Sequence, residues 1–197
     1  MPKQQDIRAD YNNKTITVYQ AYGKAIALPA IQNNRFEAPF SFNRMTWIKP
    51  SYLWLMERSN WGTKSNQDYI LGIKIKRDCW EKALAMGVLT DPDKTIYKSG
   101  LDWEQQFKQA KVHIQWDPER TLKGGKLQER SIQVGISRFL IEDYNNEWIE
   151  EIVDLTPLTK KINQLRKQGK YKEAKRLLPK ERIYNLPATI EKTIGIK

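Results

Sequence analysis

The order in which strand and helix patterns follow one another is the feature that most constrains the fold. Residues 16–22 and 68–76 alternate β-branched or aromatic residues with other types, which predicts two strands. Shorter patterns of the same kind predict strands at residues 44–49, 111–117 and 130–136. Helix patterns separate these strands without the regular strand–helix–strand repeat of a doubly wound sheet. The sequence therefore predicts an α+β fold, a single compact domain with a mixed or antiparallel sheet.

Local capping signals place helices between these strands. The predicted helices cover residues 23–32, 51–60, 79–87 and 102–110. Asp78 and Asp102 are the expected N-caps of the third and fourth helices, and Gly87 is the expected end of the third. Residues 118–129 form either a hairpin connection or a loop, and residues 137–152 are expected to be partly helical.

Positive charge is concentrated toward the C-terminus. The chain has 34 Lys and Arg residues against 23 Asp and Glu, a net charge of +11. Residues 157–197 hold twelve of these basic residues and three of the acidic ones, so this segment carries +9 and residues 1–156 carry +2. We therefore expect an α+β body (1–156) and, packed on it, a basic helical hairpin that turns around Gly169 (157–197). Its cations either contact nucleic acid or form the solvated faces of two helices; they are Lys160, Lys161, Arg166, Lys167, Lys170, Lys172, Lys175 and Arg176.

Cysteine and histidine usage excludes several chemistries. A single cysteine, Cys79, rules out an internal disulfide, and a single histidine, His113, leaves too few ligands for a Cys/His zinc site. The sequence contains no G-x-S-x-G, Walker A or G-x-G-x-x-G motif. His113 could act as a base, but a lone histidine more often has a hydrogen-bonded structural role. The sequence has no apolar leader and no run of membrane-spanning length, so we expect a cytoplasmic protein without a metal site or a membrane partner.

Residues 44–64, RMTWIKPSYLWLMERSNWGTK, combine indole rings with fixed positive charge. Pro50 suits the first turn of a helix on which Trp54 and Arg58, four residues apart, share a face. Indoles attract guanidinium groups and stack on nucleobases or nicotinamide, and arginine can bind phosphate through two donors. The segment is therefore either an aromatic core with a charged rim or the wall of a site for a flat, anionic ligand.

A second constellation follows the strand at 111–117. Asp117 precedes a proline, so the chain turns away from the sheet there and presents Asp117, Glu119 and Arg120 at a strand end. Strand ends are frequent places for chemistry. The alternative is a turn that an arginine–carboxylate pair holds in place.

The strand at 130–136 has one polar face. Alternation directs Ser131, Gln133 and Gly135 to one side, and Arg130 with two apolar residues to the other. A face of serine, glutamine and glycine buries little apolar area, so we expect it to line a polar cleft.

Five segments distributed along the chain form a distinctive set. They are, in order, IRADYNNKTITVYQAY, RMTWIKPSYLWLMERSNWGTK, VHIQWDPER, RSIQVGIS and LLPKERIY. Together they resemble a bacterial and fungal family catalogued as domain of unknown function 4291, over roughly residues 4–187. The resemblance implies a single-domain protein and brings no established activity.

The order of elements is also similar to that of the ADP-ribosyltransferase fold. That resemblance would put Gln20 on an early strand, Thr46 and Trp47 on a strand that leads into a helix, and Glu129, Arg130 or Gln133 on a late strand. Such enzymes hold NAD in a cleft and stabilise a positively charged ribosyl centre with a carboxylate. The chain departs from the pattern because the usual histidine or arginine of the first motif is absent.

The leading hypothesis is an NAD-using transferase that acts on a nucleotide or nucleic acid. Its expected catalytic residues are Gln20, Asp117, Glu129 and Gln133, and its expected nucleotide-holding residues are Arg8, Tyr19, Arg44, Thr46, Trp47, Lys49, Arg58, Trp61, Arg130 and Ser131. The competing hypotheses are a non-catalytic nucleic-acid-binding module and a protein that binds an acidic partner through its basic helices. The sharpest expectation is geometric: Gln20, Arg44 and Gln133 should open into one pocket walled by Trp47 or Trp61.

Overall fold

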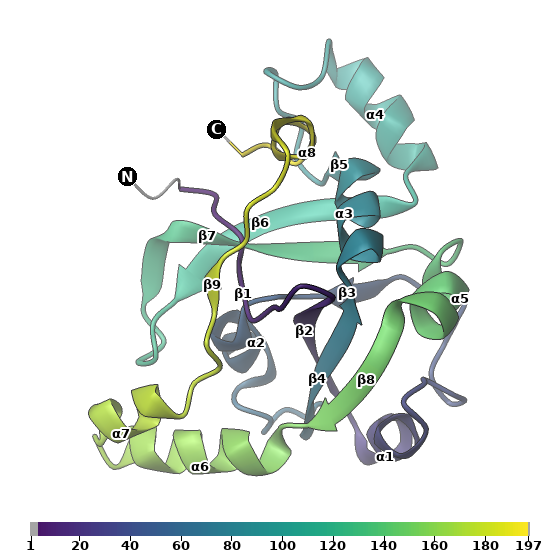
Figure 1. Ribbon diagram of the computed structural model, residues 1–197. Coiled ribbons are helices and arrows are strands. Elements are labelled where there is room, and N and C mark those ends of the chain that lie inside the picture. The colour runs from purple at the N-terminus through teal and green to yellow at the C-terminus, as the bar shows by residue number, and fades with distance from the viewer. Residues whose placement is uncertain (1–3, 197) are drawn as a thin grey trace.

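The structure is a computed structural model that describes residues 4–196, and its main feature is a pair of adjoining sheets (Figure 1). The three-stranded sheet has the order β2 (Thr15–Tyr22), β4 (Tyr69–Lys76), β8 (Ile149–Asp154). The four-stranded sheet has the order β3 (Thr46–Ile48), β7 (Lys126–Ile136), β6 (Val112–Arg120), β5 (Gly87–Leu89). A backbone hydrogen bond of 2.7 Å from Tyr19 N to Lys49 O joins β2 to the end of β3. The fold is a single α+β domain with mixed and antiparallel sheets, as expected.

The three-stranded sheet is antiparallel throughout. Strand β2 pairs with β4 over its whole length, and β4 pairs on its other edge with β8. Residues 137–152 were expected to be partly helical, and they contain the short helix α5 (Ile141–Asp143) and a π-helical turn (Tyr144–Trp148). The same segment then begins strand β8, which the sequence pattern missed. Residues Ile149 and Ile152 are buried on the sheet, and pairing with β4 overrides the helix preference of the glutamates between them.

The four-stranded sheet is built on the long β6–β7 hairpin. Its connection is a tight turn in which Thr121 N donates to Gly125 O at 2.9 Å and Gly124 takes a φ of +91°, so the hairpin alternative is correct. Strand β5 lies parallel to β6 on the outer edge. It begins at Gly87, which was expected to end a helix. A Cβ there would come within 2.5 Å of the Ile114 side chain, so close strand packing requires the glycine.

Four helices precede the hairpin, and two of the expected caps are wrong. They are α1 (Lys24–Asn33), α2 (Tyr52–Ser59), α3 (Arg77–Ala85) and α4 (Gly100–Gln109). Asp78 does not cap α3, because that helix begins one residue earlier and Asp78 lies in its first turn. The cap of α4 is Ser99, whose Oγ accepts from Asp102 N at 3.1 Å. Helix α2 is capped by Ser51, directly after Pro50.

The C-terminal segment wraps the body from one end to the other (Figure 1). Helices α6 (Thr156–Lys167) and α7 (Tyr171–Arg176) form the expected hairpin around Gly169, whose φ is +74°. The chain then adds β9 (Arg182–Ile183), which pairs with β1 (Arg8–Ala9), and ends in helix α8 (Ala188–Thr193). Within residues 4–196, no helix combines the length and apolar character needed to cross a membrane.

Two apolar clusters hold these layers together. The main core lies between the sheets and helices α1, α3 and the α5 region, with Trp80 and Tyr144 among its fully buried side chains. The second cluster packs Tyr52, Leu55 and Met56 of α2 against Ile162 of α6, together with Ala174 of α7. Helix α2 is therefore fixed between the sheets and the basic hairpin.

Candidate functional site

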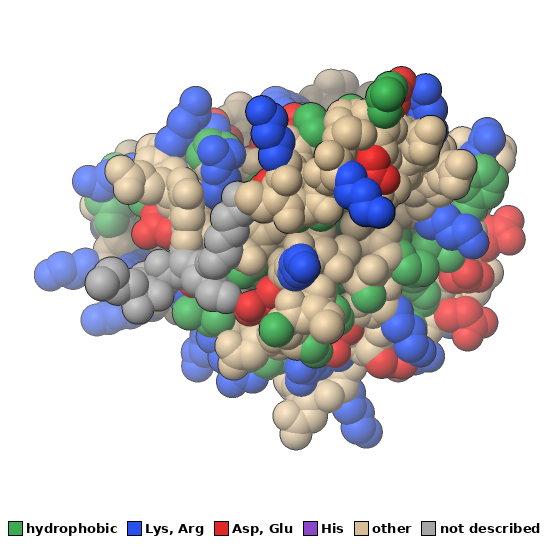
Figure 2. Space-filling model, turned by 90° about the horizontal axis from the view of Figure 1, so that it is seen from above, with side chains coloured by type: hydrophobic (Ala, Val, Ile, Leu, Met, Phe, Trp, Pro, Cys, Tyr) green, Lys and Arg blue, Asp and Glu red, His purple; other side chains and the backbone are tan. Residues whose placement is uncertain are grey.

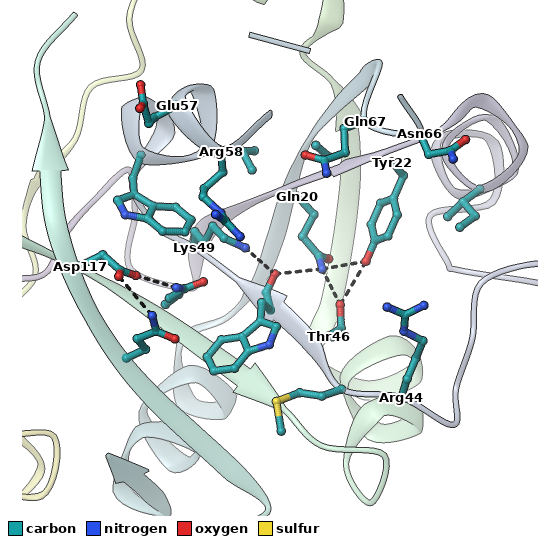
Figure 3. A pocket seen from close by; sticks show the side chains of 18 of the residues that line it. Gln20, Tyr22, Arg44, Thr46, Lys49, Glu57, Arg58, Asn66, Gln67 and Asp117 are labelled. Carbon is teal, nitrogen blue, oxygen red and sulfur yellow. Dashed lines mark hydrogen bonds between the residues drawn. The ribbon is translucent and has the colours of Figure 1, made fainter. Parts of the chain in front are cut away.

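A cavity of about 840 Å³ lies beside the junction of the two sheets (Figure 3). Its walls come from β2, β3, α2, the facing parts of β6 and β7, and the connections after α1 and α2. Gln20, Arg44 and Gln133 all line it, so the expected convergence of these three residues on one pocket is found. The other predicted site residues that line it are Thr46, Trp47, Lys49, Arg58 and Asp117.

The cavity wall carries more positive than negative charge. Arg44, Lys49, Arg58 and Arg120 line it, against the two carboxylates of Glu57 and Asp117. Arg120 Nη1 and Glu57 Oε1 form an ion pair at 3.2 Å. Within residues 4–196, Arg44, Arg58 and Lys49 form no ion pair, and the buried Nε of Arg120 has no hydrogen-bond partner. Such a wall favours an anionic ligand. The buried Lys49 is costly to keep charged without an anion, and Arg44 and Arg58 are exposed cations on the same wall.

Lys49 is the most unusual of these cations because its side chain is buried at 9 % exposure. Its Nζ donates to the carbonyl of Trp47 at 3.2 Å and lies 5.3 Å from the centre of the Trp54 ring. The pKa of Lys49 is lowered to about 7, mainly by burial and also by the nearby Arg58, while Asp117 acts in the opposite direction. The ammonium is therefore close to losing its proton at neutral pH, and a bound anion would favour the charged form.

Two indole rings form apolar surfaces of the cavity. Trp54 is buried, with the Arg58 guanidinium carbon 5.8 Å from its ring centre and Lys49 over the same ring. Trp47 is half-buried on β3 and lies across β7 at Gly135. A Cβ at Gly135 would come within 2.7 Å of Met45 Sδ and 3.0 Å of the Trp47 ring. The glycine thus permits the indole to lie flat against the strand beside the cavity.

Gln20 organises a buried hydrogen-bond network at one side of the cavity (Figure 3). Its Nε2 lies 2.6 Å from Thr46 Oγ1 and 2.9 Å from the Tyr22 hydroxyl, and its Oε1 accepts from Tyr144 at 3.0 Å. Burial raises the pKa of Tyr22 to about 12, so its hydroxyl stays protonated. Protein partners engage both ends of the Gln20 amide, which suits a residue that positions Thr46 and Tyr22.

Asp117 is held at the opposite side of the cavity by two glutamines. Gln133 Nε2 donates to Asp117 Oδ2 at 2.6 Å, and Gln115 Nε2 donates to Oδ1 at 3.1 Å. The two glutamines face each other across the β6–β7 ladder. Both carboxylate oxygens are therefore fixed in direction, and the group is the only half-buried carboxylate among the described residues that line the cavity.

Six predicted site residues lie outside the cavity; they are Arg8, Tyr19, Trp61, Glu129, Arg130 and Ser131. Tyr19 points to the face of β2 opposite Gln20 and packs edge-on against Tyr52 at 5.5 Å. Trp61 belongs to the second cluster, where the Arg166 guanidinium covers its ring at 4.8 Å. The pocket was expected to be walled by Trp47 or Trp61, and of these two Trp47 lines it.

The remaining four of these residues follow the course of β1 and β7. Arg8 is exposed on β1, and Glu129 and Arg130 are exposed where β7 leaves the core. Ser131 is buried, but it faces Glu119 rather than the cavity. The register of the β6–β7 hairpin decides this, because it brings the cavity side of β7 to Gln133 and leaves residues 129–130 beyond it.

The lining also contains residues that were not among the predicted site residues, including Tyr22, Trp54, Glu57, Gln115 and Arg120. For most of them, the sequence spacing from a predicted site residue indicates that they share its strand or helix face. Tyr22 lies two residues from Gln20 and Gln115 lies two residues from Asp117, so each shares a strand face with a predicted residue. Trp54 precedes Arg58 by one helical turn.

Two carboxylates meet at the N-terminus of α2, outside the cavity. Glu181 Oε1 accepts from Tyr52 N at 2.7 Å, and Glu119 approaches Ser51 and Ser131. The pKa of Glu181 is raised to about 8, mainly by burial and also by the charge of Glu119, while the hydrogen bond from Tyr52 N–H acts in the opposite direction. The contacts of Glu119 therefore lie at the start of α2 and not in the cavity.

His113 lies in the apolar interior and not at the cavity. Its ring packs edge-on against Phe107 at 4.6 Å, and burial lowers its pKa. Among residues 4–196, no three His, Cys, Asp or Glu side chains gather closely enough to hold a metal ion.

The model of a protein family described as domain of unknown function (DUF4291) matches residues 6–184. No curated protein matches the chain.

Proposed function

The chain belongs to the DUF4291 family, and we propose that it is a nucleotide-binding transferase that takes NAD into the cavity and transfers the ADP-ribosyl group. The single observation that carries this proposal is the composition of the cavity wall. Three cations without an ion pair in the described part of the chain lie beside two indoles and one oriented carboxylate. Diphosphate, flat ring and ribose are the three parts of a dinucleotide that such groups recognise.

The cations and rings divide the recognition of such a ligand. Arg58 and Lys49 converge on the Trp54 face, where a phosphate would bring them the anion that they lack. Trp47 offers a half-buried ring for a base or nicotinamide, and Arg44 is an exposed cation of the cavity lining. These residues bind and orient the ligand.

The positions of the polar residues support the likeness to ADP-ribosyltransferases. Gln20 is on the early strand β2, and Thr46 and Trp47 are on β3, which leads into α2. Gln133 is on the late strand β7, and the side chains of all four line one cavity. Two departures from the pattern remain: β2 presents Gln20 where those enzymes use a histidine or an arginine, and β7 presents Gln133 where they use a carboxylate.

Asp117 supplies the missing carboxylate in this proposal. When the bond between ribose C1′ and nicotinamide breaks, nicotinamide leaves with the electron pair and positive charge develops on the ribose. A carboxylate fixed by Gln115 and Gln133 stabilises that charge without reorganising. The acceptor then forms the new bond to C1′ and releases one proton.

Isothermal titration calorimetry with NAD, ATP and a short RNA tests the proposal directly. We expect NAD to bind, and Arg58→Ala to weaken binding about tenfold to a hundredfold because a charge-assisted phosphate contact is lost. The matched control is Arg138→Ala, since Arg138 is an exposed arginine that also lies against an aromatic ring, that of Phe139. If the wild-type protein binds no nucleotide, the proposal is wrong.

The exposure of the basic hairpin favours a second candidate, a non-catalytic nucleic-acid-binding module. Seven of its eight predicted contact cations are exposed, and only Arg166 is half-buried. Truncating residues 157–197 would be a poor test, because it removes Ile162 and Ala174 from the second cluster and β9 from its pairing with β1. Substituting exposed lysines leaves that packing intact. This candidate predicts RNA binding without NAD binding.

A further inference from the structure

We propose that the acceptor in this transfer is a nucleic-acid strand, which lies on the α6–α7 hairpin and reaches the cavity across the β6–β7 turn. This inference rests on the proposed function for its catalytic part. Its binding part stands on separate residues, so the two can fail independently.

We define the basic hairpin surface by seven exposed cations: Lys160, Lys161, Lys167, Lys170, Lys172, Lys175 and Arg176. Helices α6 and α7 contain one acidic residue, Glu173, and none of these cations forms an ion pair within residues 4–196. The face turned away from this hairpin is different, since Lys and Arg are scattered there among Asp and Glu (Figure 2). The charge asymmetry of the sequence is therefore also an asymmetry in space.

The β6–β7 turn connects this surface to the cavity. Lys123 of the turn lies 4.7 Å from the ring centre of Tyr171, the first residue of α7, and Leu122 packs on the second cluster. The next contact inward is Arg120, whose Nη1 donates to Gly124 O at 3.3 Å and pairs with Glu57. Arg120 and Glu57 themselves line the cavity. Lys123, Tyr171 and the Arg120–Glu57 ion pair thus connect α7 to the cavity wall.

This arrangement fits a nucleic acid better than an acidic protein. A strand carries one phosphate per nucleotide for the lysines and one flat base per nucleotide for rings such as Tyr171. An acidic peptide would satisfy the lysines but would leave the exposed ring and the indole-lined cavity without a partner. Flexible single strands can bend from the surface into the cavity, whereas a duplex cannot expose its bases there.

Fluorescence anisotropy with labelled single-stranded 20-mers of RNA and DNA tests the binding part. The test variant is Lys167→Gln/Lys170→Gln/Lys172→Gln, and the matched control is Lys94→Gln/Lys98→Gln/Lys111→Gln, three exposed lysines outside the hairpin. We expect the test variant to reduce the slope of log affinity against log salt by about 2, at about 0.7 per lysine, and the control to leave the slope unchanged. Circular dichroism melting confirms that both variants are folded.

The inference is overturned if the test variant and the control variant lose the same amount of strand affinity. It is also overturned if soluble polyglutamate abolishes strand binding as readily as competing RNA does. Mass spectrometry of the 20-mers after incubation with wild-type protein and NAD tests the acceptor part, and we expect an added ADP-ribosyl mass on the RNA or the DNA. Hairpin-dependent strand binding without NAD binding would reject the proposed function and the acceptor role together. NAD binding without strand binding would reject only the inference.

Discussion

Gln133 donates a 2.6 Å hydrogen bond to the carboxylate of Asp117 from the neighbouring strand, at the cavity wall. The bond is diagonal, because the residue directly opposite Asp117 in the ladder is Ser131. A second amide, that of Gln115, holds the other oxygen. The carboxylate is thus kept pointing into the cavity by hydrogen bonds from groups that carry no charge.

The first prediction concerns that carboxylate. Asp117→Asn should lower the rate of nicotinamide release from NAD by about 100- to 1,000-fold, because it removes the charge that stabilises the developing ribosyl cation. NAD affinity measured by calorimetry should change much less. Asp91→Asn, at an exposed position away from the cavity, is the control. A variant with unchanged release rate would show that another group carries this role.

The second prediction separates the two tryptophans that sequence reasoning treated as equals. Trp47 lines the cavity and Trp61 is buried in the second cluster. Binding of a nucleotide should quench tryptophan fluorescence, and Trp47→Phe should remove most of the quenching while Trp61→Phe retains it. The measurement is a fluorescence titration at matched protein concentration. Quenching lost in Trp61→Phe alone would place the ligand elsewhere.

The fold was predictable where local pattern and tertiary context agree. Strands β2 and β4 and helix α2 follow their sequence patterns closely, since alternation and a serine cap act locally. Strand β8 was not predictable, because its glutamates favour helix and only the free edge of β4 makes it a strand. Strand β5 is three residues long and depends on β6 for its hydrogen bonds.

The site residues could be predicted from the sequence only as far as the strand face of each side chain could be predicted. Alternation correctly placed the side chain of Gln133 on the opposite strand face from those of its two sequence neighbours, and Gln20 shares its strand face with Tyr22. Alternation alone could not tell which of the two faces of β2 meets the cavity, so Tyr19 was included although it points to the second cluster. The error at Trp61 has a different origin: a positive φ of 58° after the end of α2 turns that residue toward Arg166.

The third prediction uses the buried amine of Lys49. Its pKa falls from an ordinary 10.5 to about 7 in the folded protein, so the unfolded chain binds more protons between these values. Burial of Lys49 therefore costs stability in full below pH 7, and the cost disappears as the pH rises toward 10.5. Lys49→Met should stabilise the ligand-free protein by about 2–5 kcal/mol at pH 6 and by almost nothing at pH 10.5.

Urea unfolding at several pH values measures this difference between Lys49→Met and wild type. Lys64→Met, at an exposed lysine, should show no pH-dependent difference. A stabilisation by Lys49→Met that stays constant from pH 6 to 10 would contradict the depressed pKa.

The last prediction concerns Glu181, whose effect on stability has the opposite pH dependence. Its folded pKa of about 8 lies above its ordinary 4.5, so the native protein binds the extra proton between these values and stability declines as the pH rises from 4.5 to 8. Glu181→Gln keeps the oxygen that accepts from Tyr52 N at 2.7 Å but carries no charge next to Glu119. The variant should therefore be more stable than wild type by about 1–2 kcal/mol at pH 8.5 and equal to it at pH 4.5.

Thermal unfolding at both pH values measures the effect, with Glu173→Gln on the exposed side of α7 as the control. A Glu181→Gln variant that is destabilised at pH 8.5 would mean that the ionised carboxylate stabilises the start of α2, where the Tyr52 N–H and the helix dipole favour negative charge.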